Sequence, residues 1–114
     1  MSDCIFCKII NKDIPSEVVY EDRELIAFKD ISRLAPVHLL VIPKKHIKDL
    51  NGVAAEDEGL IGHLFGVVQK LATDYGVAES GYRVITNIGS DGGQVVPHLH
   101  FHLLGGQKLG SKLG

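Results

Sequence analysis

The chain lacks most of the features that mark a specialised sequence. Its 114 residues contain no apolar run close to the roughly 20 residues that cross a bilayer. The formal net charge is only −2, so nothing indicates a nucleic-acid-binding surface. We also find no internal repeat, no low-complexity segment and no Ser/Pro-rich linker. These absences argue against a membrane protein, a nucleic-acid-binding protein and a repeat protein.

Cysteine is scarce, and the start of the chain does not resemble an export signal. The segment MSDCIFCKII has neither the basic start nor the long apolar stretch of a signal peptide. We therefore expect a cytoplasmic protein, in which Cys4 and Cys7 are thiols or metal ligands rather than a structural disulfide. Hydrophobic residues make up 45% of the chain and charged residues 23%, as in ordinary globular proteins. The length predicts a single domain over residues 1–114.

The local patterns predict several short strands and one long helix. The segment 5–10 favours a short helix or turn. From Ala55 to about Tyr75, apolar side chains recur with a period near 3.6, and Gly76 is a suitable stop. Strands are expected at 16–22, 24–30, around 39–42, at 81–88 and at 97–106. This order predicts the α+β class with a mainly antiparallel sheet.

The last expected strand carries three of the six histidines, His98, His100 and His102. Side chains of a strand alternate between its two faces. The row would then aim three imidazoles at one site, while the apolar residues between them pack into the core. His38, on another strand, could supply a fourth imidazole. A metal site is a serious alternative, because neutral imidazole is a common metal ligand.

A glycine-rich loop, GSDGGQ, precedes the histidine row. Gly92 and Gly93 would let backbone N–H groups approach a ligand closely, and successive N–H groups can form an anion-binding nest. Such a loop beside imidazoles suits a phosphate better than a bare metal. A simple hairpin turn would also explain it.

Several segments together resemble the histidine-triad (HIT) family, in its branch of histidine-triad nucleotide-binding (Hint) proteins. The segment HLHFHLL at 98–104 matches the family signature His-x-His-x-His-x-x with apolar x, and the segments 5–22, 27–47 and 81–94 follow the family order. The ending LLGG is more similar to Hint proteins than to dinucleoside-polyphosphate hydrolases. The resemblance implies a HIT-like fold: a five-stranded antiparallel sheet, one long helix and one short helix. It also implies a homodimer in which two sheets join edge to edge.

The resemblance implies a specific chemistry for the histidine row. Family members hydrolyse purine nucleoside phosphoramidates and related nucleoside 5′-phosphate conjugates through a covalent nucleotidyl-histidine, and no metal is needed for this step. The match assigns the nucleophile to His100, whose tautomer is set by a backbone carbonyl near His98. His102 and His38 match the histidines that line the phosphate.

Other matching positions surround the nucleotide in the family. Asp30 matches the carboxylate that binds the ribose hydroxyls. The positions around the base are Phe6, Ile9, Phe28, Ile31 and Leu40, and those around the phosphate or leaving group are Asn87, Gly93, Gln94 and the backbone of Val95. Two residues depart from the pattern: Val95 replaces a common serine and Pro97 a common aromatic residue. These departures concern the leaving-group preference and the rate.

The pair CIFC at 4–7 has the spacing of metal ligands, although alone it could equally be two thiols or a redox pair. In several family members the pair binds a structural zinc ion, and here His46 and His98 would complete the set. Two thiolates and two imidazoles form a closed tetrahedral site. Other Hint proteins lack the cysteines and fold without zinc. We expect His63 to be a surface or dimer-contact residue.

Three rival functions remain open from the sequence. The first is hydrolysis of dinucleoside polyphosphates, the activity of the neighbouring branch. The second is a purine-nucleotide-binding adaptor whose catalysis is incidental. The third is a zinc-binding module that uses the histidine row as ligands.

Overall fold

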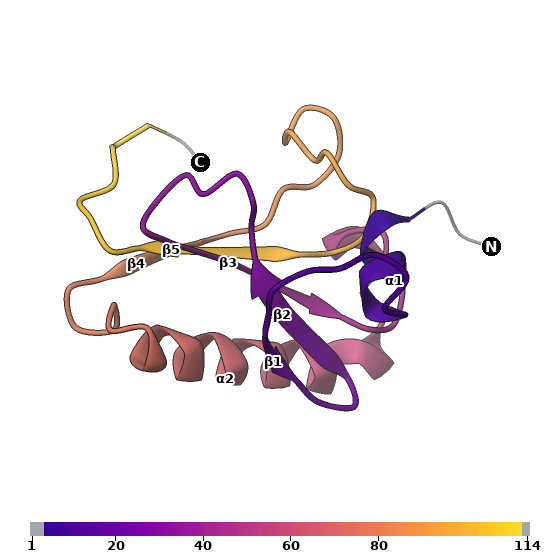
Figure 1. The fold of residues 1–114 in the computed structure, drawn as a ribbon. Helices are drawn as coiled ribbons and strands as arrows, with labels where there is room; N and C mark the ends of the chain where they lie inside the picture. Colours follow the sequence, from indigo (N-terminus) through magenta and orange to yellow (C-terminus); the bar gives the residue numbers. More distant parts are fainter. Residues whose placement is uncertain (1–3, 113–114) are drawn as a thin grey trace.

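The computed structural model describes residues 4–112. Along the chain the elements are α1 (Ile5–Ile10), β1 (Val18–Glu21), β2 (Leu25–Lys29), β3 (Val37–Pro43), α2 (Glu58–Asp74), β4 (Tyr82–Ile85) and β5 (Phe101–Gly105), with two 3-10 turns, η1 (Leu50–Gly52) and η2 (Ala55–Asp57), before α2 (Figure 1). The strands form one sheet in the order β1-β2-β3-β5-β4, and every neighbouring pair is antiparallel. This confirms the predicted α+β class and the five-stranded antiparallel sheet.

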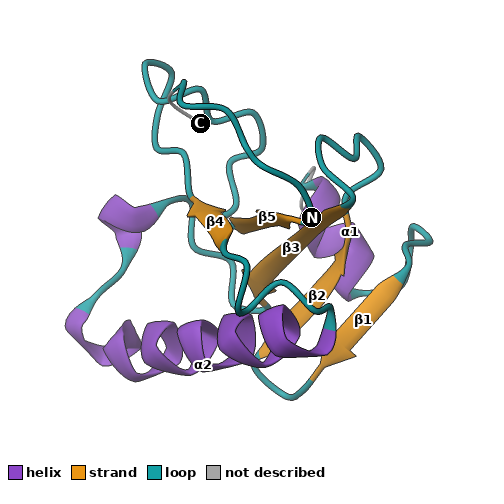
Figure 2. Ribbon diagram, turned by 90° about the vertical axis from the view of Figure 1, so that its left-hand side faces the viewer, coloured by secondary structure: helices purple, strands orange, loops and turns teal. Residues whose placement is uncertain are grey.

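The sheet is covered on both faces, with α2 along one side and α1 on the other (Figure 2). On β2, Leu25 and Ala27 pack into the core beneath α2, whereas Ile26 and Phe28 pack against α1. The alternation follows from the two-residue period of a strand. Because both faces are buried, β2 and β3 are apolar along nearly their whole length.

The long helix starts three residues later than the sequence indicates. Residues Ala55–Asp57 form the 3-10 turn η2, and α2 begins at Glu58. The buried carboxylate of Asp57 accepts the N–H of Ala54 at 3.0 Å and pairs with Lys45 Nζ at 2.7 Å. These bonds hold the tighter turn in front of the helix. No helix among the described residues is long and apolar enough to cross a membrane.

The final strand is shorter than the predicted 97–106. β5 begins at Phe101, because Pro97 has no backbone N–H and the next amides bond elsewhere. The N–H of His98 donates to Val96 C=O at 2.8 Å, and that of Leu99 to Ile47 C=O at 2.6 Å. The alternation of side chains persists nevertheless, because Leu99 packs into the core beneath α2 together with the apolar residues of β5.

Candidate active site and candidate metal site

His38 and His102 lie on neighbouring strands and on the same face of the sheet as α1. The pairing of Leu40 with His102, and of His38 with Leu104, places both imidazoles beside that face. His38 Nε2 lies 2.9 Å from His102 Nδ1. Burial lowers the pKa of His102 to about 4, and His100 and His38 nearby act in the same direction. Burial also lowers the pKa of His38. Both rings are therefore neutral at pH 7.

The hydrogen bonds assign the tautomers of these two rings. Leu34 N–H donates to His38 Nδ1 at 3.1 Å, so the proton of this neutral imidazole is on Nε2. That N–H donates to His102 Nδ1, which leaves the proton of His102 on Nε2. His102 therefore presents an N–H donor at its outer nitrogen.

His100 is buried, with only 6% of its surface exposed, and its ring is oriented by a backbone carbonyl. Its Nδ1 lies 2.7 Å from the carbonyl oxygen of His98, so Nδ1 must carry the proton and donate it. The lone pair of the ring is then on Nε2. Phe6 contacts the ring edge-on, with centroids 5.0 Å apart. His102 lies on its other side, at a centroid distance of 5.1 Å.

His98 belongs to a different cluster from its two neighbours, so the expectation that all three imidazoles converge on one site is wrong for this ring. Its Nδ1 lies 3.3 Å from Cys4 Sγ, 3.6 Å from Cys7 Sγ and 3.1 Å from His46 Nδ1. Cys7 Sγ also lies 3.3 Å from His46 Nδ1. The reason is that His98 precedes β5 and turns toward the start of α1.

The geometry of this cluster fits a tetrahedral metal ion. Two thiolates and two imidazoles around a zinc ion lie about 3.3–3.8 Å apart, given Zn–S and Zn–N bonds of about 2.3 and 2.05 Å. All four donor atoms here lie within 4.8 Å of one another. His98 Nε2 donates to the carbonyl of Pro43 at 2.9 Å, which directs the Nδ1 lone pair into the cluster. Cys4, Cys7, His46 and His98 could therefore hold a metal ion.

A second group, Asp30, His38 and His102, also brings donor atoms together but does not fit a metal. Metal binding at His38 Nε2 requires a lone pair there. The N–H of Leu34 occupies the lone pair of Nδ1 and so keeps the proton on Nε2. A metal ion would have to break this backbone bond, so we assign these three residues to hydrogen bonding alone.

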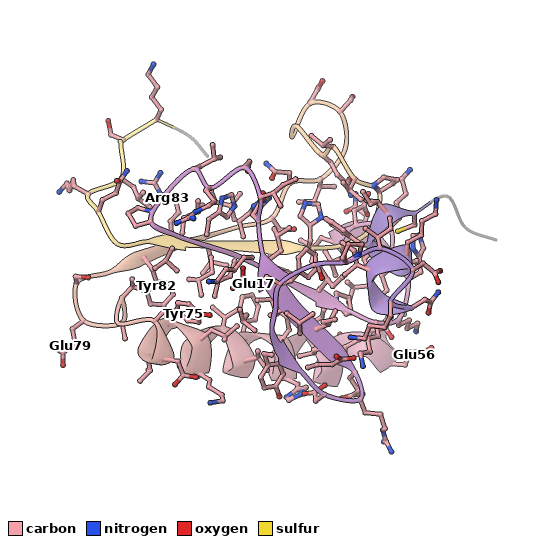
Figure 3. All side chains as sticks on the ribbon, in the orientation of Figure 1. Glu17, Glu56, Tyr75, Glu79, Tyr82 and Arg83 are labelled. Carbon is pink, nitrogen blue, oxygen red and sulfur yellow. The ribbon has the colours of Figure 1, made fainter. Side chains whose placement is uncertain are left out.

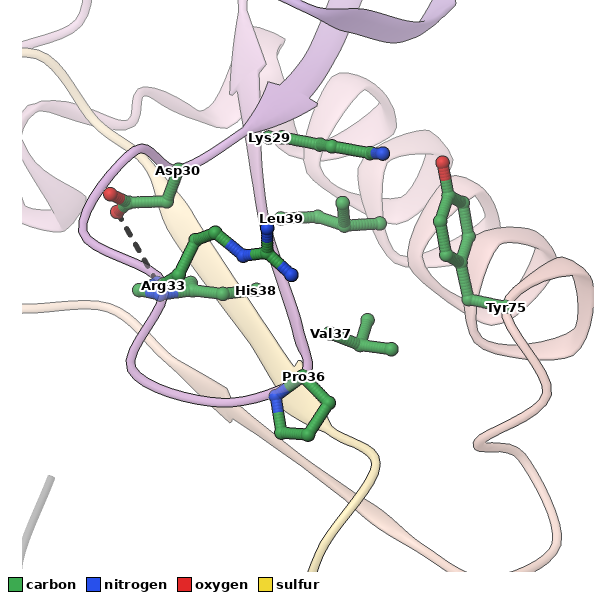
Figure 4. A pocket seen from close by; sticks show the side chains of 8 residues that line it. All are labelled: Lys29, Asp30, Arg33, Pro36, Val37, His38, Leu39 and Tyr75. Atoms are coloured by element: carbon green, nitrogen blue, oxygen red, sulfur yellow. Dashed lines mark ion pairs between the residues drawn. The ribbon is translucent and has the colours of Figure 1, made fainter.

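Asp30 lies beside these imidazoles at the end of β2. Its Oδ1 accepts the N–H and the hydroxyl of Ser32, at 2.8 and 2.7 Å, and its Oδ2 lies 3.3 Å from His38 Nε2 (Figure 4). Burial opposes its ionisation, but the bonds from Ser32 and the nearby imidazoles together keep the pKa of Asp30 below its ordinary value. The carboxylate is therefore charged at neutral pH.

A cavity of about 70 Å³ lies between the segment 29–39, which includes Asp30 and His38, and Tyr75 at the end of α2 (Figure 4). Lys29, Arg33 and Tyr75 surround it. Ligand pockets usually measure about 300–1,000 Å³, so this space is too small for a nucleoside.

Four of the five residues expected around a base form one apolar cluster. Phe6, Ile9, Phe28 and Leu40 are all buried and pack together on the α1 face. Phe6 and Phe28 meet edge to face, with centroids 5.6 Å apart. Ile31 is 98% exposed and lies outside this cluster. The structure thus brings four of these side chains together and leaves the fifth in solvent.

The glycine-rich loop is shaped by two side chains that the sequence suggested as phosphate or leaving-group contacts. Asn87 Nδ2 donates to Gly92 C=O at 2.8 Å. Gln94 Oε1 accepts the N–H of Gly89, and its Nε2 donates to the carbonyls of Lys48 and Val96. The amide of Gln94 is thus used within the protein to hold the loop. The side chain of Val95 is 88% exposed, and Gly93 has φ of +78°.

Three groups that position the histidines could not be found from the residue pattern. They are the carbonyl of Pro43 at His98, the N–H of Leu34 at His38 and the hydroxyl of Thr86 at the carbonyl of His100. Backbone groups have no residue code of their own, so no pattern could reveal the first two. Thr86 lies in the segment 81–88, which the sequence predicts as a strand, and threonine is common in strands because of its β-branched shape alone.

Comparison with known proteins agrees with this architecture. The HIT-domain family model matches residues 11–109. The chain is 49% identical over 111 residues to the purine nucleoside phosphoramidase of Escherichia coli (strain K12), covering 97% of this chain and 93% of the relative. A HIT family hydrolase from Legionella pneumophila Philadelphia 1 superposes with a TM-score of 0.95 at 46% identity, covering 98% of this chain and all of the other. A histidine triad nucleotide-binding protein from Candida albicans superposes with a TM-score of 0.81 at 33% identity, covering 98% of this chain and 87% of the other.

His100 and His102, which follow a glycine-rich loop at the start of β5 in a five-stranded antiparallel sheet, match the class of histidine-triad hydrolases. With the family model matching most of its length, the chain belongs to the HIT-domain family.

Proposed function

We propose that this protein hydrolyses purine nucleoside phosphoramidates through a covalent nucleotidyl-histidine at His100. The observation that carries the proposal is the 2.7 Å bond from His100 Nδ1–H to the carbonyl of His98. It leaves an unprotonated Nε2, which is the form of imidazole that attacks phosphorus. The similarity to the Escherichia coli purine nucleoside phosphoramidase supports the substrate class.

The reaction proceeds in two displacements. In the first, His100 Nε2 attacks the α-phosphorus, the P–N bond of the phosphoramidate breaks, and the nitrogen takes up a proton from solvent and leaves as the amine. The carbonyl of His98 stabilises the positive charge that develops on the ring, because it accepts the Nδ1 proton. In the second, water attacks the same phosphorus and loses a proton to solvent, the bond to Nε2 breaks, and the nucleoside 5′-monophosphate is released.

The neighbouring groups serve the phosphate and the nucleoside. The Nε2–H of His102 donates a hydrogen bond to a phosphate oxygen, and His38 keeps His102 in the tautomer that carries this N–H. Asn87, Gly93, Gln94 and the backbone of Val95 belong to the loop that would bind the phosphate and leaving group. Asp30 binds the ribose hydroxyls, and the apolar cluster around Phe6 contacts the base.

The Cys4, Cys7, His46 and His98 cluster would hold a structural zinc ion. Its four protein donors leave no open position for a substrate, so the ion would stabilise the fold rather than take part in hydrolysis. The ion would connect the start of α1 with the segments that follow β3 and precede β5.

A second copy of this chain is the protein partner we propose. β4 is an edge of the sheet, and Tyr82 and Val84 on it are 36% and 37% exposed; Figure 3 marks Tyr82 and Arg83 on this strand. Pairing of two such edges would remove an unpaired strand from solvent. A monomeric mass in analytical ultracentrifugation would contradict this partner. The cytoplasmic location stays a prediction from the sequence.

Rapid-quench single-turnover kinetics with adenosine 5′-phosphoramidate test the proposed function. The wild type should release AMP, and intact-mass spectrometry should detect a protein carrying one adenylyl group. His100→Ala should lose both signals while its affinity for AMP persists, because the pocket still holds the base. The matched control is His63→Ala, which removes an exposed histidine of α2 and should react like the wild type.

Two results would contradict the proposal. One is near-normal AMP release by His100→Ala. The other is faster cleavage of a diadenosine polyphosphate than of the phosphoramidate, which would favour the neighbouring branch of the family.

A further inference from the structure

Thr86 makes a contact with the nucleophile that none of the functions described above uses. It is the first residue after β4, and its hydroxyl donates to the carbonyl oxygen of His100 at 2.8 Å. The pairing of Ile85 with His102 is the last between β4 and β5. The side chain of Thr86 thus connects the two segments just beyond the point where their backbone pairing ends.

The bond from Thr86 attaches the backbone of His100 to a neighbouring segment, whereas the bond from the His100 ring to His98 does not. The ring of His100 donates to the carbonyl of His98, but both groups belong to the same three-residue stretch. That bond orients the ring within the stretch and does not position the stretch on the sheet. Leu99 N–H attaches the stretch on one side, to the carbonyl of Ile47. Thr86 attaches the His100 end to β4 on the other side.

The residue after Thr86 shapes the loop that faces the phosphate. Asn87 Nδ2 donates to the carbonyl of Gly92. Thr86 and Asn87, the two residues that follow β4, therefore hold His100 and the glycine-rich loop respectively, and so set the distance between the nucleophile and the loop. Threonine suits this role, because its β-branched side chain has few rotamers to choose from.

We propose that Thr86 is a positioning residue for His100, whose hydroxyl keeps the imidazole aligned with the phosphate. This inference rests on the proposed function, since it concerns the nucleophile of that reaction. Displacement of a reacting group by a fraction of an ångström slows attack without abolishing substrate binding. Loss of the hydroxyl should therefore lower the rate of the chemical step more than the affinity for nucleotide.

Three variants separate the hydroxyl from the shape of the side chain. Thr86→Val keeps the shape and removes the donor, Thr86→Ser keeps the donor, and Thr73→Val makes the same change at the other threonine of the chain, on the exposed end of α2. The measurements are the single-turnover rate of AMP release, the Kd for AMP and the melting temperature. Thr86→Val should react about tenfold more slowly, as expected for the loss of one aligning hydrogen bond. Its Kd should stay within about twofold of the wild type, and Thr86→Ser and Thr73→Val should keep most of the rate.

Equal rates for Thr86→Val and the wild type would overturn the inference, and so would a serine variant as slow as the valine variant. Parallel losses of rate, affinity and melting temperature would also overturn it, because they would indicate a purely structural residue. A wild type that releases no AMP would overturn the proposed function as well. A reactive wild type with an unaffected Thr86→Val would overturn the role of Thr86 alone.

Discussion

Backbone groups decide which nitrogen of His100 and of His38 carries the proton, and the ring of His38 decides it in turn for His102. The carbonyl of His98 takes the Nδ1 proton of His100, and the N–H of Leu34 occupies Nδ1 of His38. The first bond leaves the lone pair of His100 on Nε2. The second keeps the proton of His38 on Nε2, where it donates to His102 Nδ1, so that His102 keeps an N–H donor at its own Nε2. Identical side chains are thus held in opposite tautomers, which suits one for the nucleophile and the other for the donor of the proposed reaction.

Asp30 is the residue whose role can be tested through the sugar. Asp30→Ala should weaken the binding of AMP more than that of 2′-deoxy-AMP, because in the proposed function the carboxylate accepts hydrogen bonds from the ribose hydroxyls. The loss for AMP should be about tenfold, as for a hydrogen bond to a charged group. Isothermal titration calorimetry on both nucleotides measures it. The deoxynucleotide is the internal control, since it also registers any indirect effect of removing the contact with His38. Equal losses of affinity for the two nucleotides would show that Asp30 does not contact the ribose and serves only its turn with Ser32 and its contact with His38.

Among the elements, the loop between β4 and β5 is shaped by its glycines and by two amide side chains. Gly92 lies so close to the backbone of Ile88 that a Cβ would collide with the carbonyl oxygen. The loop must therefore pass close to its own start, and its geometry depends on a residue without a side chain.

Gly92→Ala should open this loop and weaken binding of the phosphate. The expected result is a KM at least about tenfold higher, with a smaller change in melting temperature, since the loop lies on the surface. The matched control is Gly62→Ala on α2, where a Cβ meets no atom within 4 Å. That variant should keep its KM and gain about 0.5–1 kcal/mol of stability, because alanine favours a helix over glycine. Unchanged kinetics in Gly92→Ala would show that the loop does not bind the phosphate.

Across the whole molecule, the metal cluster and the nucleophile share one residue. His98 contributes its ring to the cysteine cluster and its carbonyl to His100. Phe6 on α1 contacts both His98 and His100 edge-on, with centroids 5.9 and 5.0 Å apart. The position of α1 therefore affects both sites, although the metal would touch no reacting atom.

Removal of the metal should lower stability more than chemistry. Elemental analysis should find about one zinc ion per chain, and a strong chelator should lower the melting temperature by more than about 5 °C. Cys4→Ser should be equally destabilised and should not respond to the chelator. Serine can replace Cys4 as the N-cap of α1, so this variant isolates the loss of the ligand. AMP release at low temperature should largely survive. A metal-free wild type with the same melting temperature would exclude the zinc proposal and leave the role of His100 intact.

Local patterns were sufficient for the fold, because they arise from neighbouring residues. The two-residue alternation predicted a strand across the histidines, of which β5 forms the part from Phe101 onward. The 3.6-residue period predicted α2 except for the first turn of the expected helix, which the bonds of Asp57 hold as a 3-10 turn. The His-x-His-x-His signature and its companion segments were sufficient for the family. The family resemblance placed His98 with the cysteine pair and His100, His102 and His38 at the phosphate, but the tautomers of His38, His98 and His102 could not be predicted from it. These tautomers depend on contacts that no residue pattern records: His38 with His102 and Pro43 with His98 between segments far apart in the chain, and the N–H of Leu34 with His38 across a turn. Which ring nitrogen keeps its proton follows from these contacts, because a proton position is set by the atom facing it in space and not by the adjacent residue in sequence.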